Sequence, residues 1–252
     1  MMIFTVAGRE LRSLFVSPLA WSILAVVQLI LAYMFLTQLD LFMVLQSRLI
    51  GIEGAPGVTE IIAAPLLGNS AVVLLLVVPM LTMRLVSEER RSQTLSLLFS
   101  APLSMSEIVL GKFFGVMAFL LIMVAMIVLM PLSLLLGGSL DMGMLLAGVL
   151  GLVLLLGSFA AVGLFMSTLT DQPTIAAVSS FGVLLLLWII DWAGSNNVGE
   201  ASELFAYLSL LRHFESLLKG VFDSADVIYY LLFVVLFLGL SIRRLDADRL
   251  QH

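Results

Sequence analysis

The sequence contains no cysteine and only two histidines, and charged residues make up 12% of its 252 positions. Without cysteine the chain can form neither a disulfide framework nor a thiolate metal site, and the cysteine count leaves the redox compartment open. A formal net charge of −5 argues against nucleic-acid binding as the main activity, because such proteins carry a basic surface. These absences exclude several functional classes before any motif is considered.

The low content of charged residues is matched by a high content of apolar residues. They account for 62% of the chain, and the 19 glycines raise the share to about 70%, against about 45–50% in soluble domains. A chain of this length cannot hide so much apolar surface in its own interior. The composition therefore indicates a polytopic integral membrane protein.

Six apolar runs are long enough to cross a bilayer core of about 30 Å, which takes about 20 helical residues. They cover residues 19–39, 66–86, 108–136, 142–169, 174–192 and 225–242. We therefore expect an all-α fold with six transmembrane helices in a single domain over 1–252. Because the number of spans is even, both termini are predicted to lie on one side.

The distribution of basic residues predicts which side that is. Of the twelve Lys and Arg residues, Arg48, Arg212 and Lys219 fall on the side away from the termini, and the other nine fall on the terminal side. Basic residues near span ends are retained in the cytoplasm. Both termini are therefore predicted to be cytoplasmic.

Residues 1–18 predict a helix that lies in the inner headgroup layer. Apolar residues recur near helical spacing between Arg9, Glu10 and Arg12, and Pro18 interrupts the pattern before the first span. A simpler interpretation is a basic segment that only sets the orientation of the protein.

The inner segment 87–107 is the densest polar stretch of the chain and predicts a short helix, a turn and a new helix start. Ser87 can cap the short helix, and Glu88 and Glu89 suit the positive end of its dipole. An apolar stripe follows at Leu95, Leu98 and Phe99. One interpretation of this segment is a rigid charged helix between two spans that contacts a partner. The alternative interpretation is a solvated loop rich in charge.

The end of this segment predicts how the chain enters the third span. Pro102 ends the short helix, and Ser104 and Glu107 have the spacing of a capping box. Within the span, Gly111 and Gly115 predict close helix packing, and Lys112 is near enough to the inner end to extend its amine toward water. Asp171, in the short loop after the fourth span, is predicted to be a helix cap.

The outer segment 193–224 predicts an amphipathic helix at residues 202–221, lying on the outer leaflet or re-entering it. Apolar residues recur there in steps of three and four: Leu204, Leu208, Leu211, Phe214, Leu218 and Val221. His213 lies in this helix. Its only histidine partner in the sequence is His252 on the opposite side, so we interpret it as an ordinary interfacial residue rather than a metal ligand or proton relay.

Several catalytic motifs are missing. The pattern G-x-x-x-x-G-K-S/T does not occur, because Gly111 and Lys112 are followed by Phe113, so the chain has no P-loop for ATP hydrolysis. The motifs H-E-x-x-H and G-x-S-x-G are also absent, and the spans carry no charge pair at mid-depth. We therefore expect a non-catalytic membrane protein with no catalytic, cofactor-binding or metal site of its own.

Two stretches carry a resemblance to a known family. The residues SEERRSQTLSLLFSAPLS at 87–104, continuing to IVLGK at 108–112, resemble the region between spans two and three of ABC-2 type transporter permeases, especially the gliding-motility-type branch. The residues GRELRSLFVSP at 8–18 are similar to the opening of that branch. The chain differs from the pattern at Gln93, where glycine is common, and at Ser96, where an acidic residue is common.

The resemblance implies a coupling helix between spans two and three that docks into a separate ABC ATPase subunit, which would hold ATP and Mg. The residues that match this coupling element are Glu88, Glu89, Arg90, Arg91, Thr94, Leu95, Leu98 and Phe99. The resemblance also implies an N-terminal interfacial helix containing Arg9, Glu10 and Arg12, outer re-entrant helices before span six, and contact with membrane lipid. The expected assembly contains two permease chains, identical or paired with a paralogue, in the cell inner (plasma) membrane, with or without an additional envelope subunit.

Our first hypothesis for function is therefore the permease subunit of an ATP-driven exporter. The alternative is a non-transporting membrane anchor or mechanotransmitter of an ABC-type envelope or motility complex. A third hypothesis, a secondary transporter, predicts function without any ATPase. A pathway lined by Leu, Val, Met and Phe suits lipids, peptides and many drugs alike, so the sequence does not identify the cargo.

Overall fold

The computed structural model describes residues 2–49, 57–94, 104–136, 140–195 and 209–249 of the chain, and all six long elements in these ranges are α-helices. They are α2 (Pro18–Leu49), α3 (Ala64–Thr82), α6 (Met105–Leu132), α7 (Met142–Leu169), α8 (Pro173–Ser195) and α11 (Ser224–Arg249). Each is long and apolar enough to cross a membrane, and no strand occurs in the described ranges. The predicted all-α, six-span architecture is confirmed.

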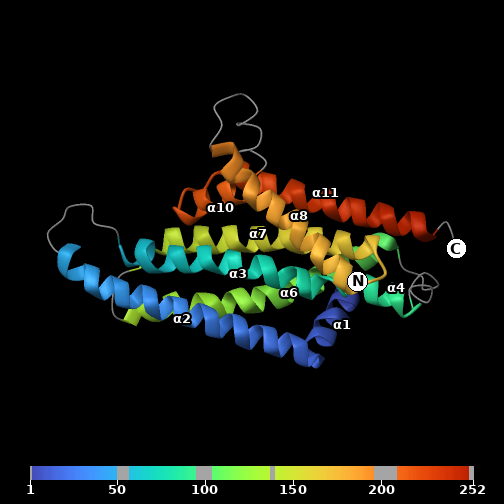
Figure 1. Ribbon diagram of the computed structural model, residues 1–252, viewed down its shortest axis with the longest axis horizontal. Helices are drawn as coiled ribbons and strands as arrows, with labels where there is room; N and C mark the ends of the chain where they lie inside the picture. The colour runs from blue at the N-terminus through green and yellow to red at the C-terminus, as the bar shows by residue number, and fades with distance from the viewer. Residues whose placement is uncertain (1, 50–56, 95–103, 137–139, 196–208, 250–252) are drawn as a thin grey trace.

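Shorter helical elements connect the long ones. They are α1 (Met2–Val16), a π-helical turn (Thr59–Ala63), α4 (Ser87–Arg91), a 3-10 turn (Ser133–Leu136) and α10 (Leu210–Leu218). Figure 1 shows the long helices side by side, with α1, α4 and the C-terminal end of α11 gathered at one end of the bundle. We call this the terminal end, because both chain termini lie there.

Helix α7 lies at the centre of the bundle. In the most apolar 18-residue stretch of α7, 72% of the residues are buried, compared with 17% in the corresponding stretch of α8. Helix α7 packs against α3, α6, α8, α10 and α11. Glycines allow the closest of these contacts: a Cβ added at Gly151 would lie 2.9 Å from the Leu217 Cβ of α10, and one at Gly163 would overlap Thr82 of α3. A central helix without charged residues suits burial on all sides.

Helix α1 folds back across the start of α6. A Cβ at Gly111 would lie 2.5 Å from the Val6 Cβ, and one at Gly115 would lie 2.7 Å from the Glu10 Cβ. The predicted close packing at these glycines is therefore confirmed, and its partner is α1. The chain turns sharply at Ser17 into α2, where the Trp21 indole donates a hydrogen bond of 2.8 Å to the Phe15 carbonyl.

The ends of the inner segment differ in part from the sequence prediction. Helix α3 ends at Thr82, and residues 83–86 form a turn before α4. The prediction that Ser87 caps α4 is wrong, because its hydroxyl donates to the Met83 carbonyl of the preceding turn. The capping box is confirmed: Ser104 Oγ accepts a hydrogen bond from the Glu107 amide at 3.2 Å, and Glu107 Oε2 accepts one from the Ser104 amide at 3.1 Å.

The outer segment forms a helix over a shorter range than predicted, as far as it is described. Helix α10 begins at Leu210 with Ser209 as its cap, and it buries Phe214 and Leu217. Val221, predicted to belong to its apolar face, lies beyond the helix and is 58% exposed. The predicted stripe residues Leu204 and Leu208 lie outside the described residues.

Candidate functional site: the α4 region at the terminal end

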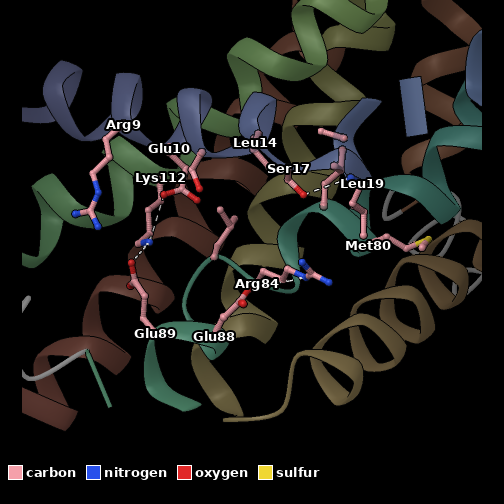
Figure 2. A pocket seen from close by; sticks show the side chains of 14 residues that line it. Arg9, Glu10, Leu14, Ser17, Leu19, Met80, Arg84, Glu88, Glu89 and Lys112 are labelled. Atoms are coloured by element: carbon pink, nitrogen blue, oxygen red, sulfur yellow. Dashed lines mark hydrogen bonds and ion pairs between the residues drawn. The ribbon is translucent and has the colours of Figure 1, made fainter. Parts of the chain in front are cut away.

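Helix α4 is held to the bundle by two clusters of charged side chains, and the first centres on Lys112. The Lys112 Nζ of α6 lies 2.7 Å from Glu89 Oε1 of α4 and 3.6 Å from Glu10 Oε2 of α1. Figure 2 shows the three side chains converging. Lys112 is 3% exposed, so the prediction that its amine extends toward water is wrong. The two carboxylates satisfy the amine inside the protein and join three helices.

The second cluster centres on Arg90, the next residue of α4. Its Nη2 donates to the Thr168 carbonyl at the end of α7 at 3.0 Å and forms an ion pair with Asp248 of α11. Its Nε lies 3.3 Å from Asp171 Oδ1 in the turn between α7 and α8. Asp171, which was predicted to be a helix cap, therefore faces α4. Asp248 has a second cationic partner, because Arg244 Nη2 lies 3.6 Å from Asp248 Oδ1.

Hydrogen bonds between one side-chain hydroxyl and three backbone groups fix the turn that leads into α4. The Ser167 hydroxyl of α7 accepts the amides of Val86 and Ser87, each at 3.0 Å, and donates to the Met83 carbonyl at 3.0 Å. The two amides lie between the end of α3 and the first turn of α4, where no helical carbonyl is available to accept them. One buried hydroxyl on the central helix thus sets where α4 starts.

The prediction that Pro102 ends the short helix is wrong, because α4 ends at Arg91 in a Schellman motif. The Gln93 amide donates to the Arg90 carbonyl at 3.1 Å and the Thr94 amide donates to the Glu89 carbonyl at 3.0 Å. Gln93 has φ 56°, in the left-handed region that favours glycine. This is the position at which the resembling sequences commonly have glycine. The same motif ends α10, where Gly220 has φ 77°.

The outer face of α4 is exposed and borders a hollow of about 580 Å³. Glu88, Arg91 and Thr94 are exposed, whereas Glu89 and Arg90 are directed to partners within the chain. The hollow is lined by Arg90, Arg91, Gln93, Asp171, Gln172, Pro173 and Thr174. The predicted apolar stripe of Leu95, Leu98 and Phe99 lies outside the described residues.

Residues of the N-terminal helix have separate roles at this site. Glu10 contacts Lys112, while Arg9 lines a cavity beside it and Arg12 is exposed. The sequence indicated that Glu10, Asp171 and Asp248 share the terminal side with α4. It did not indicate that Asp171 and Asp248 pair with Arg90, or that Glu10 and Glu89 share Lys112. Arg90 and its partners Thr168 and Asp248 are 78 and 158 positions apart, so no local spacing reports these contacts.

A second buried polar cluster joins α10 to α11, away from the terminal end. His213 Nδ1 lies 2.6 Å from Asp226 Oδ1, and the imidazole stacks on Tyr229 with ring centroids 4.1 Å apart. The Tyr230 hydroxyl donates to the Leu210 carbonyl at 2.6 Å. His213 is buried, which the interfacial interpretation did not anticipate. In the described part of the chain, no three His, Cys, Asp or Glu side chains gather as metal ligands.

Comparison with known proteins assigns this architecture to a family. No curated protein matches the chain significantly. The profile of the family described as ABC-2 family transporter protein matches residues 4–250, which include all six spans and the α4 region. Members of this family are generally non-catalytic membrane components that work with an ABC ATPase. The chain is therefore a multi-pass membrane protein that belongs to the ABC-2 family of transporter proteins.

Proposed function

We propose that this chain is the permease subunit of an ABC exporter, that two such chains form the substrate pathway, and that a separate ATPase subunit drives them through residues 87–107. Family membership and the six spans support the permease assignment. The observation that carries the coupling role is that both inward-facing residues of α4 are paired. Glu89 pairs with Lys112 of α6, which also holds Glu10 of α1. Arg90 pairs with Asp248 of α11 and with Asp171 in the α7–α8 turn.

Coupling requires that force on one surface element reaches the spans. Lys112 joins α4 to α6 and α1, and Arg90 joins it to α7 and α11, so a displacement of α4 moves these helices or separates paired charges. Separating a buried charge from its partner is costly, on the order of 3–5 kcal/mol. Movement of the connected helices is therefore the easier response.

The coupling residues then divide into two groups. The side chains of Glu88, Arg91 and Thr94 are exposed and available to the ATPase. The predicted apolar stripe of Leu95, Leu98 and Phe99, which lies outside the described residues, is assigned to the same contact in this proposal. Glu89 and Arg90 transmit the contact inward. Arg9, Glu10 and Arg12 belong to α1, the interfacial helix in this proposal, which moves with α6 through Lys112.

The proposed orientation places the terminal end in the cytoplasm, with the protein in the inner (plasma) membrane. The excess of basic residues on that side supports it, since such residues are retained in the cytoplasm. This orientation puts α4 where a cytoplasmic ATPase can reach it. ATP and Mg belong to that partner, and its closure on nucleotide binding would move the permease pair between inward and outward access.

The alternative function is a non-transporting membrane anchor or mechanotransmitter of an ABC-type envelope or motility complex. It is favoured by the resemblance of residues 8–18 and 84–112 to the gliding-motility-type branch. The same contacts at α4 would serve it, because they transmit force whatever the spans then do. Vesicle transport by the reconstituted complex distinguishes the two functions.

The coupling role is tested by Arg90→Ala in the complex with its ATPase, reconstituted in lipid nanodiscs. We expect the ATPase to remain bound, because Glu88, Arg91 and Thr94 are intact, but its hydrolysis rate to lose the stimulation that the permease provides. Arg243→Ala is the matched control, since Arg243 is an exposed arginine at the same end. Unchanged stimulation in Arg90→Ala, or an equal loss in the control, would contradict the proposal.

A further inference from the structure

A cavity of about 310 Å³ lies at the terminal end, beside the Lys112 cluster (Figure 2). It occupies the space where the bend between α1 and α2 meets the end of α3 and the start of α4. The charged residues that line it are Arg9, Glu10, Arg84, Glu88, Glu89 and Lys112. The proposed coupling role leaves this space unexplained.

The lining of the cavity is apolar on one part and charged on another. Figure 2 places Leu19 and Met80 beside Ser17 and Arg84, at some distance from Arg9. Leu19 belongs to the first turn of α2 and Met80 to the last turn of α3, so the apolar part continues onto two membrane spans. Met80 is 39% exposed on the surface of α3. The cavity therefore lies at the depth where span ends meet headgroups.

The charges that line the cavity differ in how far they are already paired. The Lys112 amine is held by Glu89 and Glu10 and is buried. Arg84 has one partner in the described ranges, Glu88, at 3.9 Å, and both side chains are about half exposed. That contact is long and solvated, which makes it weak. The Arg84 guanidinium and the Glu88 carboxylate are thus free to receive a ligand.

The lining balances its charges: three cations, Arg9, Arg84 and Lys112, face three carboxylates, Glu10, Glu88 and Glu89. A purely anionic ligand would meet the carboxylates as well as the cations. A ligand with one negative and one positive group satisfies both kinds of side chain. A guanidinium forms bidentate hydrogen bonds with phosphate, and a primary ammonium donates three hydrogen bonds to acceptors such as carboxylates.

We propose that this cavity binds the headgroup of a phospholipid that carries a phosphate and a primary ammonium, as phosphatidylethanolamine does. The phosphate lies on Arg84, the ammonium reaches the carboxylate of Glu88, and the acyl chains run along Leu19 and Met80 into the bilayer. The volume fits a headgroup rather than a whole lipid, since it lies at the small end of ligand sites, about 300–1,000 Å³. A quaternary ammonium lacks the N–H donors, so phosphatidylcholine should bind less well.

The test uses the purified complex in nanodiscs that contain equal amounts of phosphatidylethanolamine, phosphatidylcholine and phosphatidylglycerol. After extraction into detergent, native mass spectrometry counts the retained lipids. We expect phosphatidylethanolamine to be enriched over phosphatidylcholine in the unaltered protein. Arg84→Ala should lower its retention about tenfold, the effect of losing one hydrogen bond to a charged group. Glu88→Gln should lower retention of phosphatidylethanolamine but not of phosphatidylglycerol.

Matched controls are Arg243→Ala and Asp246→Asn, which remove one charge of each sign from exposed positions of α11 outside the cavity. Both should retain lipid as the unaltered protein does. Arg84→Lys, which keeps the positive charge, should restore part of the binding and so separates loss of the site from loss of folding. Equal retention of the three lipids, or equal losses in the control variants, would overturn the proposal.

Soluble phosphoethanolamine distinguishes a lipid site from a site for the free headgroup. If the acyl chains contribute through Leu19 and Met80, millimolar phosphoethanolamine or inorganic phosphate should not displace the retained lipid. Displacement by either compound would show that the cavity recognises a soluble phosphate ligand, and the lipid assignment would be wrong.

Discussion

Gln93 adopts the left-handed conformation that ends α4, and substitution can measure what this conformation costs. A non-glycine residue at positive φ, such as Gln93, is disfavoured by about 1–2 kcal/mol in the folded state. Glycine removes this penalty, but its greater freedom in the unfolded chain offsets part of the gain in stability. We therefore expect Gln93→Gly to stabilise the protein by about 0.5–1 kcal/mol, measured as a higher Tm in detergent. Ser92→Gly, one residue earlier at φ −82°, should lower it. A lower Tm for Gln93→Gly would contradict this account.

The pair of His213 and Asp226 should contribute to stability, because both side chains are buried and their hydrogen bond spans 2.6 Å. His213→Phe keeps a ring beside Tyr229 but removes the donor from a buried carboxylate. We expect a loss on the order of 3–5 kcal/mol, read from unfolding in detergent. The double variant with Asp226→Leu should recover much of the loss. If the loss of stability in the double variant equals the sum of the losses in His213→Phe and Asp226→Leu measured separately, the two side chains do not act as a pair.

At the scale of residues, the sequence predicted local interactions well and distant ones poorly. The capping box of Ser104 and Glu107 depends on residues three positions apart, and the structure contains it. Ser87 was predicted to cap α4, but the amides of Val86 and Ser87 are accepted by Ser167, which lies 80 positions from Ser87, and the Ser87 hydroxyl donates to the Met83 carbonyl instead. The burial of Lys112 was missed for the same reason, since Glu89 and Glu10 come from other helices.

At the scale of elements, Gly111 determines how closely α1 approaches α6. A Cβ there would lie 2.5 Å from Val6, so Gly111→Ala must push the two helices apart or strain them. We expect destabilisation of about 1–3 kcal/mol, typical of overpacking. Gly239→Ala in α11 is the matched control, because nothing lies within 4 Å of its added Cβ. Equal effects of the two substitutions on Tm would show that α1 is not packed as described.

The spans themselves were predictable because length and hydropathy are local properties. Helix α7 has the same bounds as predicted, 142–169, and α11 begins one residue before its prediction. Helix α2 continues ten residues past the predicted end at 39, since Gln38 and Asp40 interrupt the apolar run without ending the helix. Hydropathy reports where lipid contact stops, whereas a helix ends where its backbone hydrogen bonds do.

At the scale of the whole molecule, the proposed orientation can be tested with cysteines, because the chain has none of its own. Ser92→Cys lies at the terminal end and Val221→Cys lies after α10, and both positions are exposed. In intact cells we expect an impermeant thiol reagent to label Val221→Cys and not Ser92→Cys. Permeabilised cells, in which both should react, provide the control. The opposite labelling pattern would place the termini outside.

The assembly is a second prediction at this scale. If the chain is half of a permease pair, native mass spectrometry of the purified complex should show two permease chains, identical or paired with a paralogue, and two ATPase subunits. Arg90→Ala should leave this stoichiometry unchanged, since Arg90 faces partners in its own chain. A stable, active complex with a single permease chain would contradict the prediction.

The contacts of Arg90 also have a consequence for biosynthesis. A ribosome completes α4 when Thr168 is still 78 residues away and Asp248 is 158 residues away. During most of translation the short helix therefore has no partner for Arg90 on α7 or α11, and it acquires the last one after the sixth span has been made. A truncated or partly inserted chain would present α4 without this support. The ion pair with Asp248 therefore completes the support of α4 only in a fully synthesised and inserted subunit.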